Sequence, residues 1–397
     1  MGNIEILKEK FEEAFHTKDN LRFFFAPGRV NIIGEHIDYN GGKVFPASLS
    51  IGISAVVSLN NSDTVCIRSL NLPGEVQFNL KEGIEISENS WGNYPKGVMN
   101  YLIKEGYKLS GCNILFSGNL PDGAGLSSSA ALEVLTSYMM ITFTNKEPDK
   151  LWIAKFCQKV ENEFIKVNCG IMDSFSIAMG KKDSAILLDC NSLEYEYVPF
   201  DLEDYQLVIM NTNKKRALIE SRYNERRKEC ESILSILTNS IKISTICEAS
   251  LEQIEKYITD EVLIKRAKHV ITENKRVFDV VNALKRKDLQ TLGLLLHQSH
   301  LSLKNDYEVT GFELDTIVEE AMKYSECLGA RMTGAGFGGC AIALVKNSEI
   351  DSFKKEVSLG YKSRTGLVAS FYESKIGEGV HEHILTVSDT PLQRSLF

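Results

Sequence analysis

The sequence predicts an α+β protein of two domains. Its 397 residues exceed the length that one hydrophobic core usually organises. Strand-like segments gather before residue 80 and again near residue 200, whereas long amphipathic segments dominate the second half. Helices and strands mixed in this order favour an α+β arrangement.

The first half begins with a helix and continues into strands. Ile4, Leu7, Phe11 and Phe15 recur at helical spacing, which predicts an amphipathic helix at the start of the chain. Apolar and β-branched runs bounded by turn residues predict the strands that follow. We expect strands near 22–26, 44–58, 63–69, 75–80, 184–189, 194–199 and 205–211, and helices near 94–104, 129–143 and 149–164.

The second half is mainly helical. Long amphipathic segments lie near 217–238, 261–284, 288–303 and 311–328, before strands near 340–346 and 368–373. We expect the boundary between the two domains near residues 200–212. Because the chain has only eight prolines and no internal repeat, the domains are predicted to meet in a packed interface there. We therefore expect domains at 1–205 and 206–397, with a ligand cleft between them.

Composition narrows the classes of partner. A net charge of -8 and a pI near 5.6 disfavour nucleic acid, because binding its backbone requires a basic surface. Nine cysteines without a Cys-x-x-Cys pair suggest reduced thiols in the cytoplasm and no metal cluster. No apolar run approaches the roughly 20 residues that cross a bilayer, so we expect no membrane partner.

The densest chemical signal is a glycine-serine turn at 119–130, NLPDGAGLSSSA, which leads into an apolar helical segment. Free backbone N–H groups, small hydroxyls and the positive end of a helix dipole together suit a phosphate. The spacing fits neither a Walker loop nor a dinucleotide fingerprint. Taken alone, the turn reads about equally well as an ordinary serine cap on a helix.

Two further motifs favour ligand binding. Residues 26–42 place an arginine, a glutamate, a histidine and an aspartate between glycines, a density of polar groups suited to hydroxyl recognition. Residues 332–340, MTGAGFGGC, would let the backbone approach a ligand or a neighbouring loop. The competing interpretation of the latter motif is a glycine-rich turn before a buried strand.

These three segments resemble the GHMP kinase superfamily, and 26–42 resembles its galactokinase family. The segments CGIMD at 169–173 and SRYNERR at 221–227 resemble two more family motifs, so five occur in order over almost the whole chain. The resemblance implies an S5-domain-2-like N-terminal domain that binds sugar and phosphate and a ferredoxin-like C-terminal domain. It also implies ATP-dependent phosphorylation of galactose at its anomeric hydroxyl, the first committed step of galactose metabolism.

The resemblance assigns roles to individual residues. Asp173 matches the catalytic base and Arg29 its cationic partner, although an isolated Asp or Arg is usually just solvated. The galactose-binding residues would be Glu35, His36, Ile37, Asp38, Gly170 and Tyr223.

Nucleotide and metal roles follow the same resemblance. ATP would be held by Ser69, Gly123, Ala124, Gly125, Leu126, Ser127, Ser128 and Ser129. Ser129 and Glu161 would hold Mg²⁺, for which hard oxygen ligands are suitable. Glu163 competes with Glu161 because it lies only two residues away, and Ser69 has the weakest local support.

The chain departs from the family pattern at four positions. Ser174 stands where Gln is usual, Ile37 replaces Thr, Lys43 replaces a common His, and Lys166 occupies a position that is often Gly. Strict galactose specificity is therefore less secure than the reaction type. The alternatives are a kinase for N-acetylgalactosamine or arabinose, and a catalytically silent transcriptional sensor. Inactive sensors lack residues within the serine-alanine run, which is intact here at 127–130. We expect a monomer with no obligate protein partner.

Overall fold

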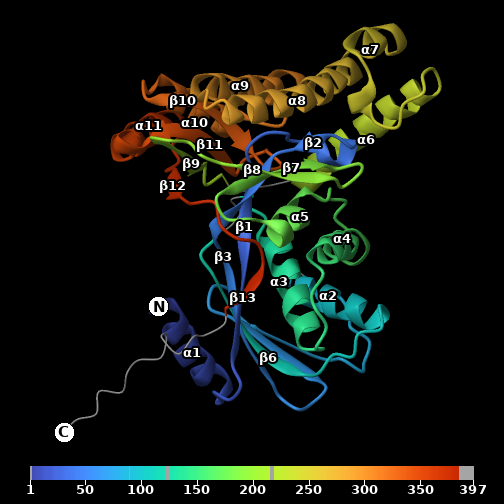
Figure 1. The fold of residues 1–397 in the computed structure, drawn as a ribbon, viewed down its shortest axis with the longest axis vertical. Coiled ribbons are helices and arrows are strands. Elements are labelled where there is room, and N and C mark those ends of the chain that lie inside the picture. Colours follow the sequence, from blue (N-terminus) through green and yellow to red (C-terminus); the bar gives the residue numbers. More distant parts are fainter. Residues whose placement is uncertain (1, 89, 122–124, 215–218, 384–397) are drawn as a thin grey trace.

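A six-stranded sheet in the order β13-β1-β3-β6-β4-β5 forms the N-terminal half of this computed structural model (Figure 1). The structure describes residues 2–88, 90–121, 125–214 and 219–383. Neighbouring strands are antiparallel except β4 and β6, which run parallel. The strands are β1 (Arg22–Asn31), β3 (Pro46–Leu59), β4 (Thr64–Ser69), β5 (Glu75–Asn79), β6 (Cys112–Gly118) and β13 (His381–His383).

Alternation along β1 explains how this sheet is covered on both faces. Phe23 packs with Leu7 and Phe11 of α1 (Gly2–Phe15), whereas the adjacent Phe24 points into the main core on the opposite face. On that opposite face α3 and α5 contact β1 and β3, and α2 and α4 pack against them. These helices are α2 (Asn93–Lys104), α3 (Ser128–Thr142), α4 (Lys150–Val160) and α5 (Met172–Met179).

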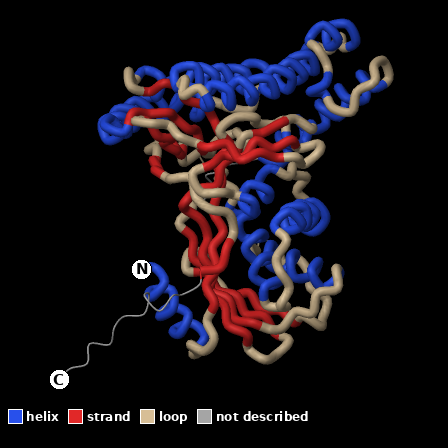
Figure 2. The backbone as a smooth tube through the Cα atoms, viewed as in Figure 1, coloured by secondary structure: helices blue, strands red, loops and turns tan. Residues whose placement is uncertain are grey.

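A small sheet and a four-stranded antiparallel sheet complete the molecule (Figure 2). The three-stranded sheet β2-β7-β8 adjoins the N-terminal half, and the order in the C-terminal sheet is β10-β11-β9-β12. The strands are β2 (Lys43–Val44), β7 (Ser184–Asp189), β8 (Tyr195–Pro199), β9 (Tyr205–Asn211), β10 (Cys327–Thr333), β11 (Cys340–Lys346) and β12 (Ser370–Glu373).

Helices pack along the C-terminal sheet and extend beyond it in Figure 1. α8 packs against α9, which lies on β10, and α10 and α11 pack together beside them. None of the helices in the described ranges is both long and apolar enough to span a membrane. The helices are α6 (Ile219–Thr238), α7 (Leu251–Tyr257), α8 (Glu261–Lys285), α9 (Leu289–Ser302), α10 (Phe312–Lys323) and α11 (Ile350–Thr365).

The two halves meet at the loop that follows β1. Arg331 of β10 donates from Nη1 to the carbonyls of Asn31 and Ile32 at 3.1 and 2.8 Å. The amide of Gly34 donates to Glu273 of α8 at 3.0 Å. The C-terminal half therefore fixes the backbone of the polar segment that the sequence singles out.

The predicted α+β class is confirmed, and most predicted strands coincide with observed ones. The segment 44–58 is two strands, β2 and β3, separated at Phe45, whose backbone hydrogen-bonds to Ile32 and Ile33. The predicted helix at 311–328 is too long, since α10 ends at Lys323 and β10 begins at Cys327. One of the two main sheets contains β1, β3, β4, β5 and β6 together with β13, which returns to pair with β1, and the other contains β9 to β12. The domain bounds at 205 and 206 stay a prediction.

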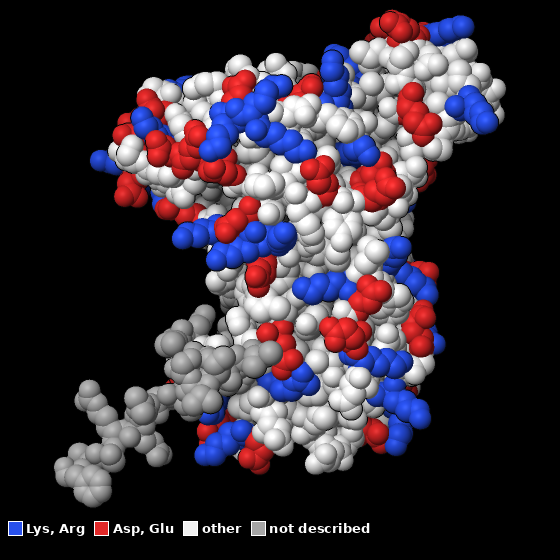
Figure 3. All heavy atoms as spheres, in the orientation of Figure 1, with Lys and Arg blue, Asp and Glu red and all other residues white. Residues whose placement is uncertain are grey.

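Charged side chains are mixed on the surface. On the face drawn in Figure 3, lysines and arginines alternate with aspartates and glutamates over both halves. The expectation that nucleic acid is not a partner rests on the net charge alone.

Candidate active site

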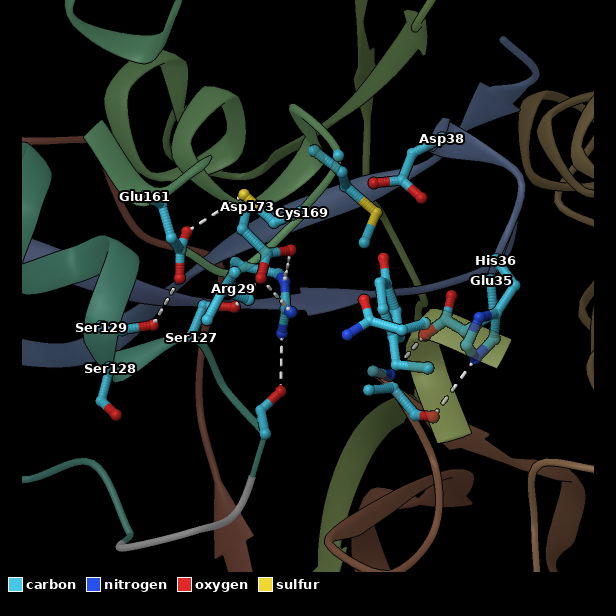
Figure 4. Close-up of a pocket in the computed structure, with 18 of the residues that line it drawn as sticks. Arg29, Glu35, His36, Asp38, Ser127, Ser128, Ser129, Glu161, Cys169 and Asp173 are labelled. Carbon is cyan, nitrogen blue, oxygen red and sulfur yellow. Dashed lines mark hydrogen bonds and ion pairs between the residues drawn. The ribbon is translucent and has the colours of Figure 1, made fainter. Parts of the chain in front are cut away.

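A cavity of about 350 Å³ lies where the end of β1, the serine turn before α3 and the Gly-rich loop after β10 meet (Figure 4). Its size is at the lower end of the range of about 300–1,000 Å³ that is typical of small-molecule sites. Four carboxylates and two cations line it: Glu35, Asp38, Glu161, Asp173, Arg29 and Lys166.

Arg29 and Asp173 form a bidentate ion pair in this cavity. Arg29 donates from Nε and Nη2 to the two Asp173 oxygens, both at 2.7 Å, and from Nη1 to the carbonyl of Gly125 at 2.7 Å. Ser127 Oγ donates to Asp173 Oδ2. Burial alone would lower the pKa of Arg29, but the charge and hydrogen bonds of Asp173, together with the charges of Glu35 and Asp38, outweigh burial and the pKa is raised. Arg29 is thus a permanent cation beside the carboxylate.

The serine turn borders the other side of the ion pair. Ser127, Ser128 and Ser129 line the cavity at the start of α3, and Ser127 is held in the left-handed region at φ 60°. No side chain in the described ranges caps this helix start. Its first N–H groups are therefore suited to an anion.

Glu161 faces Ser129 across a short gap. Ser129 Oγ lies 3.5 Å from Glu161 Oε1, and Cys169 Sγ donates to Glu161 Oε2 at 3.2 Å. Burial raises the pKa of Glu161 to about 7. A carboxylate and a hydroxyl paired in this way are hard donors that fit Mg²⁺. Glu163 instead is exposed and is not among the described residues that line the cavity.

Glu35 lies at the cavity wall between the two halves. Its oxygens accept hydrogen bonds from Thr333 Oγ1 at 3.1 Å, from the Gly334 amide at 2.6 Å and from Asn31 Nδ2. Arg331 Nη2 lies 3.3 Å from Oε2. Most acceptor capacity of this carboxylate is therefore taken by the protein itself.

His36 is a neutral, fixed imidazole. Burial lowers its pKa to about 3. Nε2 lies 3.2 Å from the carbonyl of Ala335, and Nδ1 lies 2.9 Å from the hydroxyl of Tyr39. Since a carbonyl can only accept, Nε2 carries the proton and Nδ1 accepts from Tyr39. The ring therefore acts as a shaped wall and not as an acid or base near neutral pH.

Asp38, Gly170 and Tyr223 complete the wall nearest His36. A side chain at residue 170 would collide with the Asp38 carboxylate in its present position, so the glycine lets that carboxylate lie close to the backbone. The Tyr223 ring centroid lies 5.6 Å from that of His36. Burial, and then the charge of Asp173, raise the pKa of Asp38 to about 7.

Other predicted residues lie away from the cavity. The Ile37 side chain is fully buried in the core, and Leu126 is also buried, although its carbonyl accepts from the Arg29 amide at 3.2 Å. Ser69 ends β4, where its Oγ accepts from the amides of Asn71 and Leu72 at 3.1 and 3.2 Å. Gly123 and Ala124 fall outside the described residues.

Sequence reasoning did not assign roles to several residues that shape the site. Arg331 and Thr333 bind Glu35, and Cys169 binds Glu161, yet none of them was singled out for that purpose. Ser174, at the departure from Gln, is buried and donates to the carbonyl of Ala154 at 2.9 Å without lining the cavity. The glycine-rich motif at 332–340 was the available signal for Thr333 and Gly334.

The fold agrees with known families. Residues 93–181 match the GHMP kinases N terminal domain, and residues 280–362 match the GHMP kinases C terminal domain. The *Methanococcus jannaschii* mevalonate kinase shares this fold, with a TM-score of 0.68 at 20% identity over 91% of this chain and all of that one. The architecture is thus that of a GHMP kinase.

Relatives with higher sequence identity show which family within the GHMP kinases this chain resembles. Residues 9–59 match the galactokinase galactose-binding signature. A galactokinase of *Clostridium tetani* is 51% identical over 96% of this chain and 98% of its own. A *Lactococcus lactis* galactokinase complexed with galactose superimposes with a TM-score of 0.92 at 45% identity, covering 95% of this chain and 99% of that one. The chain belongs to the galactokinase family.

The raised pKa of Asp38 predicts that this carboxylate lowers the stability of the fold when it is ionised. A carboxyl whose pKa rises from 3.8 to about 7 on folding contributes stability below pH 4 that is lost as the pH rises through 7. We expect Asp38→Asn to raise Tm by a few degrees at pH 8, with the gain shrinking towards pH 5. Thermal unfolding monitored by circular dichroism across this range measures it.

Asp189→Asn is the matched control with the opposite sign. Lys43 pairs with Asp189, and despite partial burial the pKa of Asp189 is lowered. Its contribution is present above the unfolded pKa, so this substitution should lower Tm at pH 8. An Asp38→Asn variant that also loses stability at pH 8 would contradict the account.

Proposed function

We propose that the protein transfers the γ-phosphoryl group of ATP to the anomeric hydroxyl of α-D-galactose, giving α-D-galactose 1-phosphate and ADP. The observation that carries this proposal is the bidentate Arg29–Asp173 pair, placed in one cavity with the serine turn and the polar segment after β1. The *L. lactis* relative was solved with galactose, which supports this sugar as the acceptor.

Asp173 is the proposed base. Its Oδ2 accepts from both Arg29 and Ser127, whereas Oδ1 accepts from Arg29 alone. Because a carboxylate oxygen has about two acceptor sites, Oδ1 can receive the hydroxyl proton as the sugar oxygen attacks the γ-phosphorus. The bond to the β-phosphate oxygen breaks as the new P–O bond forms. Arg29 stabilises the negative charge of the reacting groups.

The polar segment and its neighbours are the proposed sugar site. Asp38 supplies carboxylate acceptors for hydroxyls, and the fixed rings of His36 and Tyr223 shape the wall. A site built to pair particular hydroxyls leaves its own polar groups unsatisfied with an epimer. Glu35 and Gly170 would contact the sugar from the cavity wall, and Ile37 would do so through its backbone, because its side chain is buried in the core.

The start of α3 is the proposed phosphate site. Gly125 and the serines at 127–129 border it, with Gly123, Ala124, Leu126 and Ser69 retained as proposed nucleotide contacts. Ser129 and Glu161 would hold Mg²⁺, which neutralises phosphate charge and orients the transferring group when bound.

The cellular compartment, the oligomeric state and the absence of a protein partner are also proposals. The nine cysteines are all free, in keeping with a reducing compartment, so we place the enzyme in the cytoplasm. It would act as a monomer on two small-molecule substrates, with no obligate protein partner.

Phosphorylation of a sugar panel tests the reaction. We expect the purified protein to convert galactose with ATP and Mg²⁺ to the α-1-phosphate, identified by NMR, in preference to glucose, N-acetylgalactosamine and arabinose. Asp173→Asn should lower kcat by about 10²–10⁴-fold while still binding galactose in calorimetry. Asp173→Asn turnover within tenfold of the unsubstituted protein, or no product from galactose, would sink the proposal.

Two neighbouring glutamates offer a matched test of the metal site. Glu161→Gln should raise the Mg²⁺ concentration needed for half-maximal activity by about tenfold or more, because it removes a charged ligand. Glu163→Gln changes an exposed residue and should leave that concentration unchanged. Magnesium titrations of both variants decide between the two residues, and equal effects would refute the assignment of Glu161.

A further inference from the structure

The cavity has only one cation, among the described residues that line it, whose charge is not already committed. Arg29 is bound to both oxygens of Asp173 and to the Gly125 carbonyl. Lys166 lines the same cavity, has an exposed side chain, and forms no ion pair with any described residue. The lining has four carboxylates and only this one uncommitted cation, so it offers little positive charge to pair with the phosphates of ATP.

The backbone places Lys166 beside the proposed metal residue. Its amide donates to the carbonyl of Glu161, which closes the wide helical turn at Glu161–Ile165. Glu161 in turn faces Ser129 at the start of α3. In Figure 4, Glu161 and Ser129 lie on the opposite side of the cavity from Glu35 and His36. The bond from its amide therefore tethers Lys166 on the side of the proposed phosphate site.

The conformation of Lys166 is unfavourable for a side chain. Its φ is 70°, in the left-handed region where residues other than glycine are strained. Three such residues line the cavity, namely His36, Ser127 and Lys166. Strained residues are often retained where they serve a site. Each of the other two has a defined contact in the cavity, whereas the Lys166 ammonium does not.

We propose that Lys166 is a nucleotide-binding residue, whose ammonium group pairs with the β- or γ-phosphate of ATP on entry of Mg²⁺–ATP. The inference rests on the proposed function, because it needs a nucleotide at the serine turn. A flexible lysine donates to phosphate as a point charge and needs no fixed partner in the free protein. Pairing offsets the excess of carboxylate charge around the transferring group.

Direct binding of a non-hydrolysable analogue tests the proposal. In isothermal titration calorimetry with Mg²⁺ and AMP-PNP, Lys166→Gln should weaken binding by about five- to tenfold, and Lys166→Arg should largely restore it. The KM for ATP should rise by a similar factor, with the KM for galactose unchanged. The loss should shrink at high salt, because screening weakens the pair in the unsubstituted protein.

Glycine at residue 166 separates a binding role from a structural one. Lys166→Gly removes the charge and relieves the left-handed strain, so Tm should stay equal or rise while nucleotide affinity falls. Lys287 is the matched control: it is also a lysine with positive φ, at 57°, and it lies outside the cavity in ion pairs with Asp201 and Glu203. Lys287→Gln should leave nucleotide affinity unchanged.

The outcomes are distinguishable from failure of the proposed function. If AMP-PNP binds the unsubstituted protein but Lys166→Gln binds it within twofold, the role of Lys166 is overturned while the kinase assignment stands. Equal weakening by Lys166→Gln and Lys287→Gln would overturn it too, since the effect would then be one of net charge. If galactose is not phosphorylated but the Lys166 effect on AMP-PNP binding persists, the nucleotide role survives and the acceptor assignment fails.

Discussion

The ion pair between Arg29 and Asp173 connects the parts on which the site depends. It joins the end of β1 to the first turn of α5, and the third donor of the same guanidinium holds the carbonyl of Gly125. One side chain thus fixes Asp173, the end of β1 and the turn at Gly125 relative to one another. Arg29 itself is almost fully buried, so its charge must be paired to be tolerated there.

A second buried cluster joins the C-terminal half to the polar segment after β1. Arg331, Thr333 and Gly334 converge on Glu35, and His269 Nε2 donates to the backbone carbonyl of Glu35 at 3.0 Å. Breaking such a pair leaves an uncompensated charge, which typically costs about 3–5 kcal/mol. The polar segment after β1 therefore has its shape only when both halves are folded together.

Sequence patterns predicted the α+β class and picked out several residues that line one cavity, because glycine, serine and charged clusters leave a local signature. Arg29, Asp173, Ser129 and Glu161 do converge. The patterns missed β10, since a buried arginine at residue 331 interrupts its apolar run and its partner Glu35 is remote in sequence. Nor could these patterns show that the Ile37 side chain is buried in the core, or that the Ser69 hydroxyl accepts a hydrogen bond from the amide of Asn71 within its own turn.

In the proposed reaction, Asp173 meets the reducing end of a hexose while the serine turn holds the nucleotide. A crystal structure of the protein with galactose, Mg²⁺ and AMP-PNP measures this most directly. We predict the anomeric oxygen about 3 Å from Asp173 Oδ1, with the γ-phosphorus on its far side and in line for attack. A sugar bound with another hydroxyl at Asp173, or a triphosphate away from residues 125–129, would contradict it.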